Sequence, residues 1–174
     1  MREKIIQEVL KKFEVKGVKF TLDDIAKGLS ISKKSIYEYF SGKDDLLSST
    51  VDYVFDDVLK QQYDILASSM SNVDKLKSIL CVYPSMMQIN NEKMDKFEEL
   101  YPLIYKHIHR RFITNWEMTF KALDTCIESG EIKDIDHDIF RTIFVGLFDS
   151  VLNESNQQDL LRKCIDVIFE GLLI

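Results

Sequence analysis

The sequence predicts an all-α fold in which three short helices precede a larger helical body. Apolar residues recur at three-and-four spacing along nearly the whole chain, which is the pattern of amphipathic helices. Only two prolines interrupt the 174 residues. Residues that cap helix starts stand in front of several of the periodic segments. No segment shows the convincing two-residue alternation of a half-buried strand.

The first helix is expected to end at Gly17, where glycine can adopt a left-handed conformation. Four apolar residues at helical spacing form its buried face: Ile6, Val9, Leu10 and Phe13.

The second and third helices have clear start signals. Thr21 and Asp24 have the spacing of a capping box, in which each side chain bonds the other residue's backbone N–H. Ser32 is expected to cap a third, short helix that ends near Phe40. Only two or three residues separate these two helices. This arrangement predicts a helix-turn-helix, whose second helix reads DNA.

The remaining segments predict a body of longer helices. Ser41 and Asp44 repeat the capping-box spacing and begin a long helix. Pro102 marks a break, and Gly130 ends the long segment that follows it. Two further helices have apolar faces of double width, which indicates that they cover more than an internal core.

Composition restricts the class of protein. The apolar content of 45% is too high for a disordered chain, and no apolar run approaches the roughly 18 residues that span a bilayer. The three cysteines form neither a disulfide framework nor a zinc motif. His107 and His109 are two residues apart on a helix, so they point to opposite sides and predict no metal site. We therefore expect a cytoplasmic protein with no membrane association, metal or cofactor.

Charge divides the chain into two proposed domains. Residues 1–47 hold 10 Lys/Arg and 8 Asp/Glu, a net charge of +2, whereas residues 48–174 hold 13 and 21, a net charge of −8. An acidic body with a slightly basic first module allows a local contact with DNA but not wrapping over the whole surface. The predicted domains are a DNA-binding domain over 1–47 and a second domain over 48–174.

The first turn of the third helix combines lysines with hydroxyl groups. Lys33, Lys34 and Ser35 lie at the N-terminal end of this helix, where free backbone N–H groups and the positive end of the helix dipole favour phosphate. Tyr37 and Tyr39 add phenolic hydroxyls shortly after them. A solvated surface helix would have the same composition, but three capped helix starts in this order favour DNA contact.

The stretch FTLDDIAKGLSISKKSIYEYFSGKDDLL resembles the DNA-binding signature of the TetR (tetracycline-repressor-like) family of bacterial regulators. The resemblance covers roughly residues 3–50. It implies a three-helix DNA-binding module followed by a ligand-binding and dimerisation body of about six helices. It also implies that phosphates or base edges are contacted by Thr21, Lys33, Lys34, Ser35, Tyr37, Tyr39 and Lys43.

Two positions depart from the family pattern. Ser30 replaces the usual glycine of the turn, which would cost about 1 kcal/mol if the residue needs positive φ. Lys34 replaces a small residue of the reading helix and adds a long hydrogen-bond donor. The second change favours an operator preference particular to this protein.

The body is expected to bind a small effector and a second copy of the chain. An apolar or aromatic effector is favoured, in a pocket among the middle helices; the candidate lining residues are Met86, Phe97, Tyr101, Tyr105, Phe112 and Trp116. The two terminal helices are expected to form a homodimer that binds a near-palindromic operator. The candidate interface residues are Phe140, Phe144, Phe148 and Phe169.

The resulting hypothesis is a sequence-specific transcriptional regulator, a repressor whose operator binding an effector modulates. The long helix that begins near Asp44 would connect the two domains. No nucleophile elbow, phosphate loop, nucleotide-binding turn or metal-ligand cluster indicates an enzyme. Two alternatives stay open: a helix-turn-helix protein without an effector, and a helical protein-interaction module that does not touch DNA.

Overall fold

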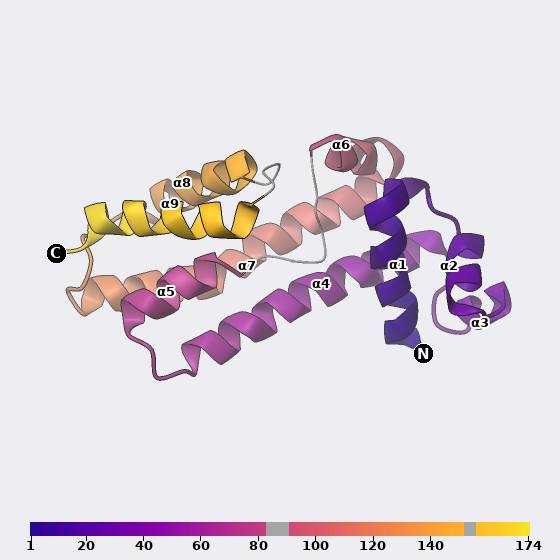
Figure 1. Ribbon diagram of the computed structural model, residues 1–174, viewed down its shortest axis with the longest axis horizontal. Coiled ribbons are helices and arrows are strands. Elements are labelled where there is room, and N and C mark those ends of the chain that lie inside the picture. Colours follow the sequence, from indigo (N-terminus) through magenta and orange to yellow (C-terminus); the bar gives the residue numbers. More distant parts are fainter. Residues whose placement is uncertain (83–90, 152–155) are drawn as a thin grey trace. The chain divides into compact units, whose positions relative to one another are not determined.

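The computed structural model describes residues 1–82, 91–151 and 156–174, and these form an all-α fold, as predicted. Its elements are α1 (Arg2–Lys16), the 3₁₀-helix η1 (Gly17–Lys19), α2 (Leu22–Leu29), α3 (Lys33–Tyr37), α4 (Lys43–Leu66), α5 (Asn72–Leu80), α6 (Asn91–Leu100), α7 (Pro102–Glu128), α8 (His137–Val151) and α9 (Gln157–Leu172) (Figure 1). A single antiparallel bridge between Ile132 and Leu173 is the one β-type pairing among the described residues. No described helix has the length and apolar character needed to cross a membrane.

The predicted helix starts are confirmed with one correction. Thr21 and Asp24 form both bonds of the capping box, and the Ser32 side chain caps α3 by accepting the N–H of Ser35. The partner of Ser41 is Asp45 rather than Asp44: Asp45 Oδ2 accepts the Ser41 N–H at 2.8 Å. The expected spacing was wrong because α4 begins at Lys43, which makes Asp45 its third residue.

Positive-φ residues lie where the sequence predicted chain reversals. Gly17 ends α1 with φ 56° and Gly130 follows α7 with φ 71°. Ser30 has φ 55° and ψ 41°, so the left-handed turn between α2 and α3 is made by a residue with a Cβ. Pro102 begins α7, as expected of a residue whose missing N–H costs nothing at a helix start.

The described residues form two compact units. Unit 1 contains residues 1–56 and the described part of 84–112, and its core joins α1, α2, α3 and the start of α4 to α6 and the start of α7. Within it the rings of Phe13 and Phe97 lie 5.3 Å apart between centroids. The N-terminal helices therefore share one core with a segment that follows them by about 50 residues of chain.

Unit 2 contains residues 57–83 and 113–174, as far as they are described. Its core is built from α5, the second part of α7, α8 and α9, with α8 and α9 side by side (Figure 1). Phe140, Phe144 and Phe169 are completely buried in it. Both long helices contribute residues to the two units, because α4 and α7 each begin in unit 1 and end in unit 2.

Candidate nucleic-acid interface

The turn between α2 and α3 is fixed by backbone hydrogen bonds and by a small buried residue. The Ile31 N–H donates to the Ala26 carbonyl at 3.0 Å, which closes the turn around Ser30. Ala26 is 6% exposed and Ile36 is fully buried, and both belong to the core that α2 and α3 share. The sequence overestimated the length of α3, since its regular turns end at Tyr37 and residues 38–40 form a tighter turn before α4.

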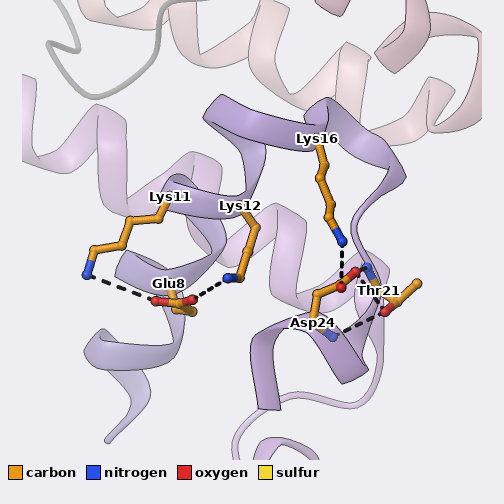
Figure 2. Close-up of polar contacts among 6 residues, drawn as sticks. All are labelled: Glu8, Lys11, Lys12, Lys16, Thr21 and Asp24. Carbon is orange, nitrogen blue, oxygen red and sulfur yellow. Dashed lines mark hydrogen bonds and ion pairs between the residues drawn. The ribbon is translucent and has the colours of Figure 1, made fainter. Parts of the chain in front are cut away.

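Thr21, the N-cap of α2, is held by Asp24 and Lys16. The Thr21 N–H and hydroxyl donate to Asp24 Oδ2 at 2.8 and 2.9 Å, and Lys16 Nζ on α1 lies 2.6 Å from Asp24 Oδ1 (Figure 2). The hydrogen bond from Lys16, followed by those from Thr21, lowers the pKa of Asp24 far below its ordinary value. Lys16 thereby ties the start of α2 to the end of α1.

Lys33 and Lys34 differ in their surroundings. Lys33 Nζ lies 2.8 Å from Asp23 Oδ2 on α2, with both side chains about half exposed. The hydrogen bond to Asp23 raises the pKa of Lys33. Lys34 is exposed and makes no ion pair with any residue the structure describes, so its ammonium is available to an external anion.

Of the other candidates on α3 and the turn after it, the two tyrosines face solvent and Ser35 is partly exposed. Tyr37 is 54% exposed and Tyr39 is 44% exposed, which is high for aromatic side chains in a small module. The Ser35 hydroxyl lies 3.0 Å from the Ser32 hydroxyl at the start of the helix. The structure thus places Lys33, Lys34, Ser35, Tyr37 and Tyr39 within one short segment, beside the exposed N-cap Thr21 on the preceding helix.

Lys43 lies apart from this group because its ammonium points into unit 1. Lys43 Nζ donates to the carbonyls of Val18 and Phe20 at 2.6 and 2.5 Å. The same nitrogen lies 4.4 Å from the centre of the Phe20 ring and 5.3 Å from that of Tyr101. Lys43 therefore joins the start of α4 to the η1–α2 connection, a structural role that the sequence did not reveal.

Known proteins match this module and the fold as a whole. Residues 5–50 match the family model described as bacterial regulatory proteins, tetR family. The resemblance to the TetR family that the sequence predicted is confirmed over these residues. The match spans all of α2 and α3 and ends within α4, so it contains every residue proposed above to meet DNA.

Similar proteins match this chain over nearly their full lengths. The HTH-type transcriptional regulator YvaF of Bacillus subtilis (strain 168) is 26% identical, with 99% of this chain and 95% of the relative covered. The regulator FadR from Bacillus subtilis, solved in complex with stearoyl-CoA, has a TM-score of 0.76 at 18% identity, with 98% and 99% covered. A TetR/AcrR regulator from Thermobifida fusca has a TM-score of 0.72 at 21% identity, with 98% and 97% covered.

The six predicted pocket residues do not belong to one core. Phe97, Tyr101 and Tyr105 contribute to the core of unit 1, whereas Trp116 is 6% exposed in the core of unit 2. Phe112, on α7, is 40% exposed. Met86 lies outside the described residues.

A depression of about 420 Å³ in unit 2 has a different lining. It lies at the end of α7 and the start of α8, and its lining residues are Asp124, Ile127, Glu128, Asp134, Ile135, Asp136 and His137. His137 Nε2 lies 2.7 Å from Asp124 Oδ1, and its ring stacks on Phe120 at 4.3 Å. None of the six predicted pocket residues lines this acidic depression.

The residues proposed for a dimer interface are turned inward. Phe140, Phe144 and Phe169 have no exposed surface, and their rings pack in sequence at 4.5 and 6.4 Å. Phe148 is partly buried against the same core. The exposed apolar residues of these two helices are instead Ile139, Ile143 and Val167, which are 57%, 39% and 67% exposed. The sequence recognised two apolar stripes on α8 but not which stripe faces outward.

His107 has a structural partner that the sequence did not predict. Its Nε2 lies 2.8 Å from Asp52 Oδ1 on α4, and Arg110 Nη2 lies 3.1 Å from its Nδ1. Arg111 reaches Asp56, one turn farther along α4. Within unit 1 these pairs connect α7 to α4 at the surface.

Proposed function

We propose that this protein is a TetR-family, sequence-specific DNA-binding regulator of transcription that acts by binding and not by catalysis. The observation that carries the proposal is the group of exposed lysine and tyrosine side chains between Lys33 and Tyr39, which follows the turn at Ser30 within the matched module. Phosphate contacts fix a protein on DNA and base-edge contacts select the sequence. The free ammonium of Lys34 and the phenols of Tyr37 and Tyr39 are suited to both tasks.

The proposed contact set is the one the resemblance implies: Thr21, Lys33, Lys34, Ser35, Tyr37, Tyr39 and Lys43. Lys43 differs from the rest, since contact with a phosphate would require its ammonium to leave the carbonyls of Val18 and Phe20. Thr21 is restricted in a similar way, because its hydroxyl donates its proton to Asp24 Oδ2 and would have to release that bond to donate to a phosphate. The proposed boundary of this DNA-binding domain is residue 47, and a DNA partner would place the protein in the cytoplasm.

Selection of random duplex DNA on the purified full chain tests this function. We expect a near-palindromic sequence whose affinity falls steeply with salt, because each neutralised phosphate releases a counterion. Lys34→Ala is expected to weaken binding to all duplexes and to flatten the salt dependence by about one ion. Tyr37→Phe removes only a hydroxyl group, so any loss of DNA affinity in this variant measures the contribution of one hydrogen bond. Absence of enrichment even at low salt would favour an interaction module instead.

We further propose that a small-molecule effector modulates operator binding, and that the bound effector releases the protein from its operator and so relieves repression. The support is the similar fold of a regulator solved in complex with stearoyl-CoA. A ligand shifts the DNA-binding equilibrium only if it prefers one conformation of the protein over the other. Because α4 contributes residues to both units, it is the element through which we expect that preference to act.

Trp116 provides a direct test of the effector, because it is the only tryptophan of the chain. It is buried beside Phe120, with the two rings 5.7 Å apart, so a change in packing would alter its fluorescence. We expect an apolar or aromatic ligand, with long-chain acyl-CoA as the first probe, to change this emission and to weaken operator binding over the same concentration range. Operator binding unaffected by any ligand that the protein binds would support regulation without an effector.

We also propose a homodimer formed by α8 and α9. Its support is the set of exposed apolar side chains Ile139, Ile143 and Val167 on two adjacent helices. A two-fold dimer presents two copies of α3 to half-sites about one turn of DNA apart, or a multiple of it. In this proposal Phe140, Phe144 and Phe169 support the interface from the core beneath it.

A further inference from the structure

The first turn of α2 holds two adjacent carboxylates, and each is paired with a lysine from a different helix. Asp24 Oδ1 lies 2.6 Å from Lys16 Nζ on α1, and Asp23 Oδ2 lies 2.8 Å from Lys33 Nζ on α3. Both pairs join helices of the module that the family model matches. The two aspartates are therefore adjacent in the sequence but connect α2 to different helices, Asp24 to α1 and Asp23 to α3.

The two carboxylates have different structural roles. Asp24 also completes the capping box of Thr21, so its charge is required for the start of α2. Asp23 has no such second bond among the described residues, and Lys33 is the cation it contacts there. The side chains of Asp23 and Lys33 are 58% and 48% exposed, and exposed pairs of this kind add little to stability. The Asp23–Lys33 pair is therefore easily broken by a competing anion.

Lys33 is the first residue of α3 and belongs to the proposed DNA contacts. An ammonium already paired with a carboxylate must give up that partner, at least in part, before it can pair with a phosphate. Its neighbour Lys34 has no such competitor among the described residues. Pairing with a phosphate is therefore expected to be less favourable for Lys33 than for Lys34, because only Lys33 must leave a carboxylate first.

We propose that Asp23 is an internal competitor that sets the affinity of the module for DNA by occupying Lys33 in the free protein. The proposal rests on the proposed DNA-binding function. In this proposal Lys33 pairs with a phosphate, so Asp23 weakens binding to every duplex by a similar factor and leaves sequence preference unchanged. The effect is greatest at low salt, where ion pairs and phosphate contacts are both strongest.

The test measures equilibrium binding of the full chain to the selected operator and to a scrambled duplex by fluorescence anisotropy. Asp23→Asn is expected to bind both duplexes about two- to fivefold more tightly at low salt, with a smaller gain at about 200 mM salt. Circular dichroism confirms that the variant is folded, and Asp23→Ser serves as a second variant. Asp44→Asn is the matched control: Asp44 also lies in the first turn of a helix of this module and forms no ion pair among the described residues.

A second background separates competition from simple repulsion of DNA by a carboxylate. In the Lys33→Gln background Asp23 has no ammonium to pair with. Adding Asp23→Asn there is expected to increase DNA affinity by no more than Asp44→Asn does. An equal gain from Asp23→Asn in both backgrounds would overturn the proposal in favour of repulsion. Weaker binding by Asp23→Asn alone would also overturn it, because Asp23 would then hold Lys33 in its DNA-binding position.

Failure of the inference is distinguishable from failure of the function. If the unmodified protein binds the selected duplex and Asp23→Asn binds with unchanged affinity, the function stands and Asp23 is not a competitor. If the unmodified protein binds no duplex at low salt, the proposed function fails and the inference fails with it.

Discussion

Gly28 on α2 faces the carboxylate of Glu8 on α1 so closely that no side chain fits between them. A Cβ at residue 28 would lie 1.9 Å from Glu8 Oε1 and 2.6 Å from its Cδ. Glu8 is 7% exposed, and its Oε1 pairs with Lys12 Nζ at 3.1 Å, with Lys11 at 4.0 Å from the other oxygen (Figure 2). The approach of α1 to α2 therefore depends on a glycine in a helix and on a buried carboxylate opposite it.

Gly28→Ala is expected to lower the free energy of unfolding by about 1–2 kcal/mol, although alanine is the better helix former. The added methyl group must displace Glu8 from its buried position and from Lys12. Urea denaturation of the full chain measures the change.

The control for Gly28 is the same substitution in a Glu8→Ala background. There the space is open, and Gly28→Ala is expected to raise stability by up to about 1 kcal/mol. A loss of stability of equal size in both backgrounds would show that Glu8 is not the obstacle. Gly42→Ala, whose Cβ would meet nothing within 4 Å, is expected to be near neutral.

Lys43→Met is expected to destabilise the protein by about 2 kcal/mol even without DNA, because hydrogen bonds from a charged donor are worth more than neutral ones. The substitution keeps the aliphatic stem but leaves the carbonyls of Val18 and Phe20 without the ammonium. Thermal or urea denaturation checks the prediction.

Lys34→Met is the matched control for Lys43→Met. Lys34 is exposed, so its loss is expected to change stability by less than about 0.5 kcal/mol while weakening DNA binding. If Lys43→Met leaves stability unchanged, the inward hydrogen bonds of Lys43 contribute nothing to the fold.

Stability is expected to fall with acid through Asp24. Its pKa in the folded protein lies far below the ordinary value because Lys16 and Thr21 bond the carboxylate. Below about pH 4 the unfolded chain therefore binds a proton that the folded chain does not, and stability is lost as pH falls. Urea midpoints measured from pH 7 to pH 3 should show this slope.

Asp24→Asn is expected to be less stable at pH 7 and to show a shallower decline below about pH 4. Asp44→Asn, an exposed carboxylate of the same module with no ion pair among the described residues, is expected to keep the slope of the unmodified protein. Parallel slopes for Asp24→Asn and the unmodified protein would assign the acid sensitivity to other carboxylates.

Ile143→Arg is expected to produce a folded monomer. Ile143 is 39% exposed on α8, so a charge there would oppose the association of two α8–α9 faces without entering the core. Light scattering at micromolar concentration measures the assembly, and operator affinity is expected to fall in parallel.

Phe144→Ala separates core from interface. Its ring is fully buried between Phe140 and Phe169, so truncation is expected to cost about 3–5 kcal/mol of stability. A stable Phe144→Ala variant that is monomeric would instead support a direct interface role for this residue. An unmodified protein that is monomeric would remove the dimer proposal altogether.

Local sequence signals were sufficient to predict helix starts where the side chain of a single residue fixes the backbone conformation. Thr21 and Asp24 predicted the start of α2 and Ser32 that of α3, because side-chain caps act over three or four residues. At Pro102 the sequence predicted a break, and α7 begins there. At Ser41 the carboxylate partner is Asp45, one residue later than predicted.

The sequence by itself determined the all-α class, the helix-turn-helix and the segment from Lys33 to Tyr39, since these depend on periodicity and on neighbours in the chain. Only the tertiary structure decided that Lys43 points inward, that Asp23 holds Lys33 and that Phe144 is core while Ile143 is surface. Two apolar stripes on one helix are equivalent until another helix covers one of them. Likewise, an ammonium finds its partner among groups that only folding brings within a few ångströms.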